Sequence, residues 1–158
     1  MKNLIVFFLG IAILSIGACT KKVDTEANVA TIKSSLEKFD AALNASDLDG
    51  LMSCFTEDAV RMPPNTPALV GKEAIRNMFQ SRFEHYTTEV HNTSEEVIVC
   101  GDWAFVWGTH TVTFALKVGG ESIRDNGKSI TIWQRQTDSS WKLYSGIYNS
   151  DLQPSGAQ

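Results

Sequence analysis

Residues 103–114 read WAFVWGTHTVTF, and this stretch decides the fold class. Its side chains alternate, so that Trp103 and Trp107 fall on one side and Val106 and His110 on the other. A period of two residues is typical of a β-strand, whose successive side chains point to opposite faces of a sheet. Because both sides carry apolar residues, we expect one face to pack on helices and the other to need a cover of its own.

The same alternation extends outward from this stretch in both directions. Turn residues such as Gly101-Asp102 and Gly119-Gly120 divide it into segments. The predicted strands are residues 88–100, 103–118, 123–136 and 141–149. Long consecutive strands joined by short turns form an antiparallel meander.

The preceding part of the chain has helical patterns instead. Apolar residues recur every three or four positions over residues 25–45 and in a short segment that begins near Ser46. Residues 59–62 read as a brief strand, the proline-rich residues 63–67 cannot continue it, and Gly71 precedes a third helix. Three helices followed by a sheet predict an α+β fold, with the helices on one face.

The N-terminus differs from the rest of the chain. Residues 1–18 combine a positive start, an apolar run and small residues, as in a secretory signal peptide. The run is too short to cross a bilayer as a helix, which takes about 20 apolar residues. Ile16-Gly17-Ala18-Cys19 resembles the lipobox of bacterial lipoproteins. That resemblance implies a lipid on Cys19 and a location in the bacterial cell envelope, on the outer membrane facing the periplasm in a diderm; the alternative is a plain secretory signal that ends near a cysteine.

Domain boundaries and composition follow from this reading. We expect a signal peptide over 1–18, a lipidated tether over 19–28, one domain over 29–152 and a tail over 153–158. The formal net charge of −4 argues against nucleic acid as a partner, since nucleic-acid binding calls for a basic face.

Cys54 and Cys100 either form a disulfide or remain as two buried thiols, and we favour the thiols.

The order of several short segments resembles the nuclear transport factor 2-like superfamily, which includes the ketosteroid isomerases, and most closely its SnoaL-like bacterial members. The segments that carry the resemblance are residues 55–60, 63–65, 71–75, 101–104, 133–136, 141–143 and 149–151. The resemblance covers about residues 29–152 and implies a cone made of a curved antiparallel sheet wrapped by three N-terminal helices. It says little about activity, because the superfamily hosts isomerases, dehydratases, cyclases and members without a known reaction.

Ketosteroid isomerisation is the best-understood chemistry that this resemblance implies. It needs an aspartate base, with a tyrosine and a neutral aspartic acid that hydrogen-bond the oxyanion. Alignment with that pattern places Phe39 at the tyrosine, Pro63 at the base and a residue near Ile130 at the acid. None of these side chains can donate or exchange a proton, so we do not expect this reaction.

Two other residues are candidates for proton transfer. Asp40 lies on the first predicted helix, and a carboxyl group at the mouth of an apolar cone would have a raised pKa; the alternative is a solvated helix carboxylate. His110 lies in the middle of a strand, and histidine exchanges protons near neutral pH; the alternative is a hydrogen-bonded histidine of the sheet. The sequence has no zinc-type His or Cys spacing, and we expect neither a metal nor a cofactor.

The aromatic residues suggest a ligand and a partner. We expect the cone to bind a small apolar molecule, although the same residues would also make an ordinary filled core. The predicted lining consists of Phe39, Met62, Phe79, Phe83, Ile130, Ile132, Ser145 and Asn149. The outer face of the sheet is predicted to form a homodimer through Trp133, Tyr144 and Tyr148; the alternative is a monomer whose aromatic residues lie on a broad sheet or contact the C-terminal tail.

Three functions are therefore open. The first is a membrane-anchored protein that binds a small apolar molecule without chemistry. The second is a SnoaL-like isomerase, cyclase or dehydratase that uses Asp40 or His110. The third is an envelope interaction module with a filled pocket. A cavity of several hundred cubic ångströms that holds Asp40 or His110 would favour the enzyme.

Overall fold

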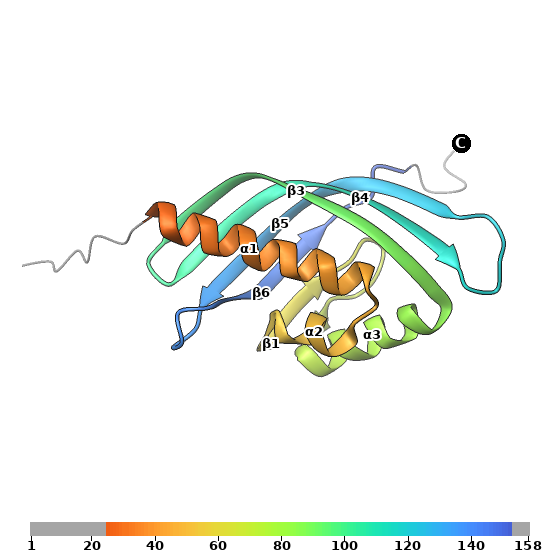
Figure 1. The fold of residues 1–158 in the computed structure, drawn as a ribbon, viewed down its shortest axis with the longest axis horizontal. Helices are drawn as coiled ribbons and strands as arrows, with labels where there is room; N and C mark the ends of the chain where they lie inside the picture. The colour runs from red at the N-terminus through yellow and green to blue at the C-terminus, as the bar shows by residue number, and fades with distance from the viewer. Residues whose placement is uncertain (1–24, 153–158) are drawn as a thin grey trace, which may run out of the picture.

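The computed structural model describes residues 25–152 (Figure 1). The predicted signal peptide, Cys19 and the tail over 153–158 lie outside the described residues. Residues 25–28, predicted as tether, are the first turn of a helix. The elements in chain order are α1 (Thr25–Asn44), α2 (Leu48–Ser53), β1 (Phe55–Met62), β2 (Leu69–Val70), α3 (Lys72–His85), β3 (Tyr86–Cys100), β4 (Trp103–Leu116), β5 (Ile123–Arg135) and β6 (Trp141–Tyr148).

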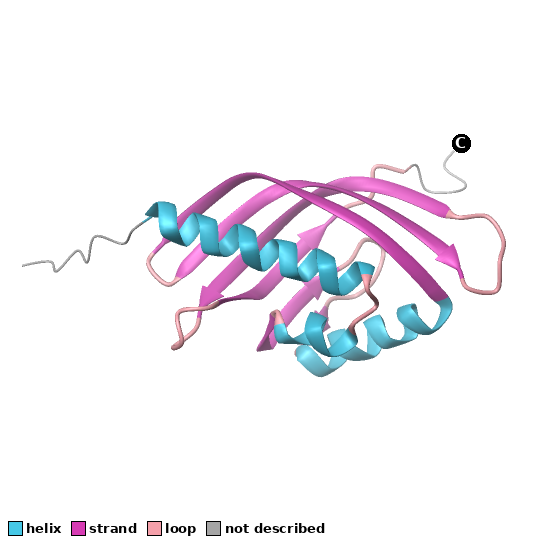
Figure 2. Cartoon of the chain, viewed as in Figure 1, coloured by secondary structure: helices cyan, strands magenta, loops and turns pink. Residues whose placement is uncertain are grey.

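The strands form one curved sheet in the order β2-β1-β6-β5-β4-β3. The long strands β3 to β6 make the predicted antiparallel meander, and the helices lie on one side of the sheet (Figures 1 and 2). The predicted α+β fold is thus confirmed. One detail differs: β1 pairs parallel to β6, so the sheet is mixed. β1 precedes α3, and this helix returns the chain to the far edge of the sheet before the meander begins.

α1 is attached to the edge of the sheet by the side chain of Asn44. Its Oδ1 accepts a hydrogen bond from the backbone N–H of Val90 on β3 at 2.7 Å, and its Nδ2 donates to the Val90 carbonyl at 3.0 Å. An edge strand has backbone groups without a neighbouring strand, and these groups need partners elsewhere. Asn44 supplies them and fixes the last turn of α1 against β3.

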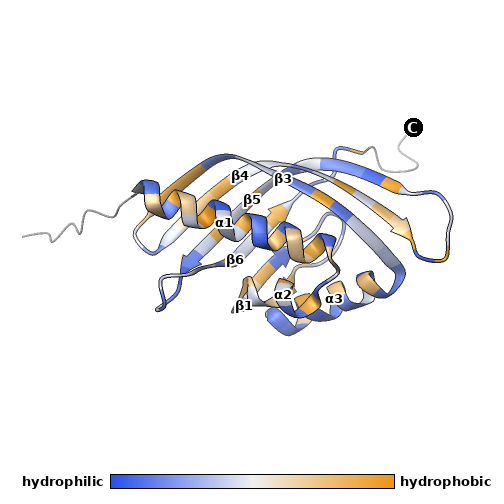
Figure 3. Ribbon diagram, viewed as in Figure 1, coloured by the Kyte–Doolittle hydropathy of each residue, from blue (hydrophilic) through white to orange (hydrophobic). Residues whose placement is uncertain are grey.

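The hydrophobic core lies between the helices and the concave face of the sheet. Hydrophobic and hydrophilic positions alternate along α1 (Figure 3), and its residues Ile32, Phe39 and Leu43 belong to the buried core. The aromatic rings of Phe39, Phe55 and Phe79 follow one another across it, with centroids 5.8 and 6.3 Å apart. The fully buried large side chains are Ile32, Leu51, Met52, Phe55, Ile75, Phe79, Trp133 and Leu143.

The pairing of β4 with β5 corrects the predicted position of Trp133. Trp133 pairs with Ala104 on the concave face and is 0 % exposed, so it belongs to the core and cannot form a dimer surface. Ile130 and Ile132 instead pair with Trp107 and Phe105 on the outer face, and Ile130 is 54 % exposed. Strand phase follows from register, and the sequence leaves the register open because both faces of these strands are apolar.

The two cysteines are free thiols. Cys54 is half-buried, and burial raises the pKa of its thiol. Cys100 is exposed at the end of β3, which corrects the expectation that both thiols are buried. Among residues 25–152, no helix is both long and apolar enough to cross a membrane.

Candidate functional site

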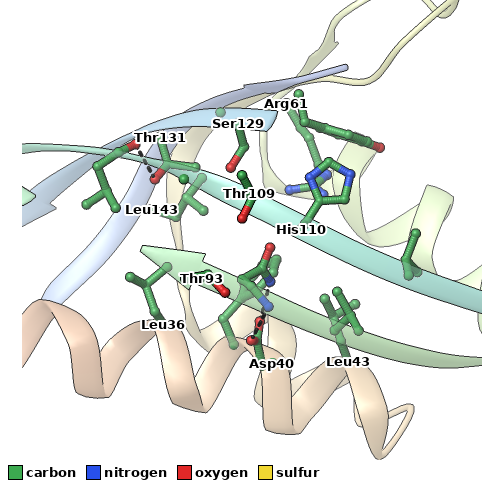
Figure 4. A pocket seen from close by; sticks show the side chains of 18 of the residues that line it. Leu36, Asp40, Leu43, Arg61, Thr93, Thr109, His110, Ser129, Thr131 and Leu143 are labelled. Carbon is green, nitrogen blue, oxygen red and sulfur yellow. Dashed lines mark hydrogen bonds between the residues drawn. The ribbon is translucent and has the colours of Figure 1, made fainter. Parts of the chain in front are cut away.

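A cavity of about 400 Å³ lies between α1 and the concave face of the sheet. α1 forms one wall with Leu36, Phe39 and Leu43, and the inward-facing residues of β3, β4, β5 and β6 form the other (Figure 4). Charged and polar side chains share the lining with the apolar ones. They include Asp40, Arg61, Arg82, Asn92, His110, Asp125, Ser129 and Tyr148. The predicted lining was almost wholly apolar, so this composition is a correction.

Most of the predicted lining residues lie elsewhere. Phe39 lines the cavity as predicted. Phe79 and Phe83 are buried in the core behind it. Ile130 and Ile132 lie on the outer face. The remaining predicted residues, none of which lines the cavity, are Met62, Ser145 and Asn149.

Asn149 and Met62 illustrate why the prediction missed. Asn149 follows β6, and its Oδ1 accepts a hydrogen bond from the backbone N–H of Lys128 at 2.7 Å. On β1 the cavity is lined by Arg61, the residue before Met62, so the assumed strand phase was wrong by one residue. A charged residue inside an otherwise apolar short strand was the signal that could have identified Arg61.

His110 lies on the concave face of β4 and lines the cavity. It is 8 % exposed, and no residue of 25–152 forms a hydrogen bond with either nitrogen of its ring. Among the described residues, no backbone or side-chain group supplies the hydrogen bond that the alternative of a sheet histidine expects. Burial lowers the pKa of His110, and the positive charge of Arg61 lowers it further, while Asp125 and Asp151 oppose this shift. His110 is thus neutral near pH 7, with a ring nitrogen free to accept a proton.

The neighbours of His110 fix its ring. The ring of Tyr148 meets it edge to face, with centroids 5.8 Å apart. On β5, Gly127 pairs with His110, and a Cβ at that glycine would stand 2.8 Å from His110 Cε1 and 2.1 Å from the Asn149 carbonyl oxygen. The missing side chain of Gly127 therefore leaves the space that the histidine ring needs.

Asp40 lines the cavity from α1 but is already engaged. Its Oδ2 accepts a hydrogen bond from the backbone N–H of Asn92 at 3.1 Å, and its Oδ1 accepts another from the side-chain amide of Asn92 (Figure 4). Burial raises the pKa of Asp40, and the bonds from Asn92 partly offset that rise. Asp40 lies four residues before Asn44 on α1, and both side chains bond to the edge strand β3. We assign it to positioning α1 on β3 rather than to proton transfer.

Arg61 reaches the cavity from β1 and lies close to His110 (Figure 4). Its guanidinium carbon is 4.7 Å from the ring centroid of Tyr148, 5.3 Å from that of Phe79 and 5.8 Å from that of Phe39. Its Nε is buried and has no hydrogen-bond partner. Burial lowers the pKa of Arg61, but a guanidinium stays charged in proteins. The cavity therefore holds a permanent positive charge beside a neutral histidine.

Tyr148 is a further site residue that the sequence analysis placed wrongly. It was predicted on the dimer surface, but it lines the cavity and contacts both His110 and Arg61. Of the predicted dimer residues, only Tyr144 contacts the outer aromatic face, with its ring 5.1 Å from that of Trp103.

The ketosteroid isomerase positions can now be placed. Phe39 and Pro63 line the cavity and carry no group that exchanges a proton. Ile130 lies on the outer face, so its alignment with the neutral acid was wrong. Within the described part of the chain, no three His, Cys, Asp or Glu side chains are grouped closely enough to hold a metal ion.

Comparison with protein-family models identifies the domain. The model of the SnoaL-like domain matches residues 36–139. The chain belongs to the SnoaL-like domain family. The matched residues run from α1 to the turn after β5, so the SnoaL-like domain includes His110, Arg61 and most of the cavity wall. No curated protein matches the chain.

Solved structures agree with this SnoaL-like fold. A ketosteroid isomerase-like protein from Erwinia carotovora atroseptica is 24 % identical, with a TM-score of 0.72 over 80 % of this chain and 98 % of that one. A nuclear transport factor 2-like superfamily protein from Salmonella enterica serovar Typhimurium is 13 % identical, with a TM-score of 0.74 over 85 % and 99 %. A hexachlorocyclohexane dehydrochlorinase is 18 % identical, with a TM-score of 0.72 over 83 % and 90 %. At these identities the likeness concerns the fold.

Proposed function

We propose that this SnoaL-like protein is an enzyme in which His110 removes a proton from a carbon atom of a small substrate held in the cavity. The observation that carries the proposal is a neutral, unbonded histidine beside an arginine in a cavity of about 400 Å³. Cavities of this size hold small organic molecules. The enzyme among our predicted functions is therefore favoured over a binder without chemistry and over a filled interaction module.

The proton transfer uses two groups of the cavity. A ring nitrogen of His110 takes the proton, and the electron pair of the broken C–H bond moves toward an adjacent carbonyl oxygen of the substrate. The positive charge of Arg61 stabilises the negative charge that develops on that oxygen. The proton then returns to a different atom, which gives an isomerisation, or a leaving group departs from the neighbouring carbon, which gives an elimination. Tyr148 positions the histidine ring for the transfer.

A deuterium-exchange experiment tests this proposal without knowledge of the substrate. The purified protein is incubated in D₂O with a panel of aryl ketones and keto acids, and NMR measures deuterium incorporation next to the carbonyl group. We expect accelerated exchange of at least one compound, and a loss of about a hundredfold or more in His110→Gln. His85→Gln is the matched control, because His85 is an exposed histidine of α3 outside the cavity. Equal exchange by His110→Gln and the unchanged protein, or none by either, contradicts the proposal.

We also propose that the enzyme is anchored to the cell envelope by a lipid on Cys19. The lipobox-like residues 16–19 and the preceding apolar run support this anchor. Stable anchoring requires two or more acyl chains, which a lipoprotein cysteine carries. In the native host, Cys19→Ser is expected to abolish incorporation of labelled palmitate and to move the protein from the membrane fraction to the soluble fraction. Unchanged membrane association of this variant would contradict the anchor.

The outer face of the sheet supports a homodimer, which we propose with a corrected set of residues. Large apolar side chains are exposed along the paired strands β4, β5 and β6, and a contiguous apolar surface of this kind is typical of an interface. They are Trp103, Phe105, Trp107, Ile130 and Ile147. Phe105→Glu is expected to give a monomer in analytical ultracentrifugation, whereas Thr111→Glu, further along the same face of β4, should remain dimeric. A monomeric unchanged protein would contradict the dimer.

A further inference from the structure

The cavity holds two arginines rather than one. Arg82 on α3 lines the cavity together with Arg61 on β1. Their guanidinium groups contact the same ring: the carbon of Arg61 is 5.3 Å from the Phe79 centroid, and that of Arg82 is 5.4 Å from it. Arg82 also lies 5.0 Å from the ring centroid of Phe114. The positive charge of Arg82 lowers the pKa of Arg61, as expected of two like charges at close range.

Neither arginine has a counter-ion in the described part of the chain. The ion pairs of residues 25–152 join other side chains: Lys72 to Glu57, Arg76 to Asp49, Lys128 to Asp151 and Arg135 to Asp102. The acidic residues of the cavity are not paired with the arginines either. Asp40 is held by Asn92, Asp125 accepts a hydrogen bond from Ser150 at 2.8 Å, and Glu37 forms no ion pair. Both arginines therefore lack a direct ion pair, although the carboxylates of Glu37, Asp40 and Asp125 also line the cavity.

Such an arrangement is costly unless a ligand completes it. A buried charge is normally paired, and a guanidinium has five N–H donors that fit the two oxygens of a carboxylate. Aromatic rings offset part of the cost, and the side chain of Tyr148 accepts one hydrogen bond from Arg61, but the remaining donors need other partners. The buried, unpartnered Nε of Arg61 is a donor that is still free.

We propose that the substrate is a small organic carboxylate whose carboxylate group lies at the Arg61–Arg82 pair. The rest of the cavity favours an organic anion over an inorganic one, because Leu36, Leu43 and Val106 present an apolar surface to the body of the ligand. The inference rests on the proposed function in so far as it names the substrate class for the proton transfer by His110. The binding of the anion itself is independent of the reaction.

Fluorine NMR with para-fluorobenzoate and its neutral analogue para-fluorobenzamide tests the inference on the purified protein. We expect saturable binding of the benzoate at millimolar concentration and weaker binding of the benzamide by about tenfold or more. Arg61→Gln and Arg82→Gln should each remove this preference, and the matched control Arg76→Gln, on α3 but outside the cavity, should keep it. If Arg61→Gln does not fold, the comparison of the two probes on the unchanged protein still decides.

The outcomes separate this inference from the proposed function. The carboxylate site is overturned if the two probes bind equally or if the benzoate does not bind. It is also overturned if inorganic phosphate displaces the benzoate from the cavity. His110→Gln should keep the preference for benzoate, since the histidine does not hold the anion. Preserved benzoate binding together with failed deuterium exchange would leave the anion site standing and contradict the proton transfer alone.

Discussion

Replacing Arg61 with methionine should stabilise the protein in the absence of ligand. Arg61→Met removes a guanidinium whose Nε is buried and that has no ion pair among residues 25–152, and a methionine of similar length can occupy the same space. The change loses contacts with three aromatic rings, each of about 0.5–2 kcal/mol, although the thioether regains part of them. It also relieves the desolvation of the charge, and replacing buried charges with apolar residues gains about 1–4 kcal/mol.

Sulfur–aromatic contacts of about 0.3–1.5 kcal/mol each replace most of the lost ring contacts. We therefore expect the free energy of unfolding to rise by up to about 3 kcal/mol, or the Tm by up to about 10 °C. Urea unfolding and calorimetry of the ligand-free protein measure it. Arg76→Met is the matched control, because Arg76 lies on the protein surface and pairs with the exposed Asp49 at 3.0 Å. Loss of that surface pair should cost at most about 1 kcal/mol. The reasoning is refuted if Arg61→Met lowers the stability by more than the control does, because Arg61 would then be a structural residue.

Three further changes test the packing and charge of the site. Gly127→Ala should destabilise the fold by about 1–3 kcal/mol in urea unfolding, because its Cβ would overlap the Asn149 carbonyl oxygen; unchanged stability would show that the strands part easily at this point. Asn44→Ala should cost about 1–2 kcal/mol, since it leaves the N–H and carbonyl of Val90 without their partner, and hydrogen exchange at the Val90 amide should accelerate. Burial lowers the pKa of His110, so the unfolded chain binds more protons there than the folded one, and stability is lost as the pH falls through the ordinary histidine range. His110→Gln should remove that part of the pH dependence, and an unchanged pH profile would contradict the shift.

The sequence was sufficient to predict the elements but not the phase of the strands. Strong alternation in residues 103–114 and turn glycines gave the boundaries of β4 to within two residues of those observed. Which face Trp133 occupies depends on its pairing with Ala104, and that register is a long-range property. A bulge between Ile132 and Trp133 also shifts the register of β6, so that Tyr148 faces the cavity rather than a partner.

The sequence predicted only part of the candidate site, because the rest depends on contacts between residues far apart in the chain. His110 and Asp40 could be named because few titratable residues interrupt the apolar patterns of the chain. The hydrogen bonds of Asp40 to Asn92 join residues that are 52 positions apart, so only the fold reveals that this carboxylate is engaged. Arg61 and Arg82 come from a strand and a helix that are separated in the chain, and their convergence on Phe79 follows from packing alone.

An NMR titration of His110 tests the central claim most directly, namely that a neutral histidine lies beside an arginine without an ion pair. We expect a pKa below the ordinary histidine value in the ligand-free protein, and a higher pKa in Arg61→Met, since that variant removes a nearby positive charge. A pKa at or above the ordinary value, or one that Arg61→Met leaves unchanged, would contradict it.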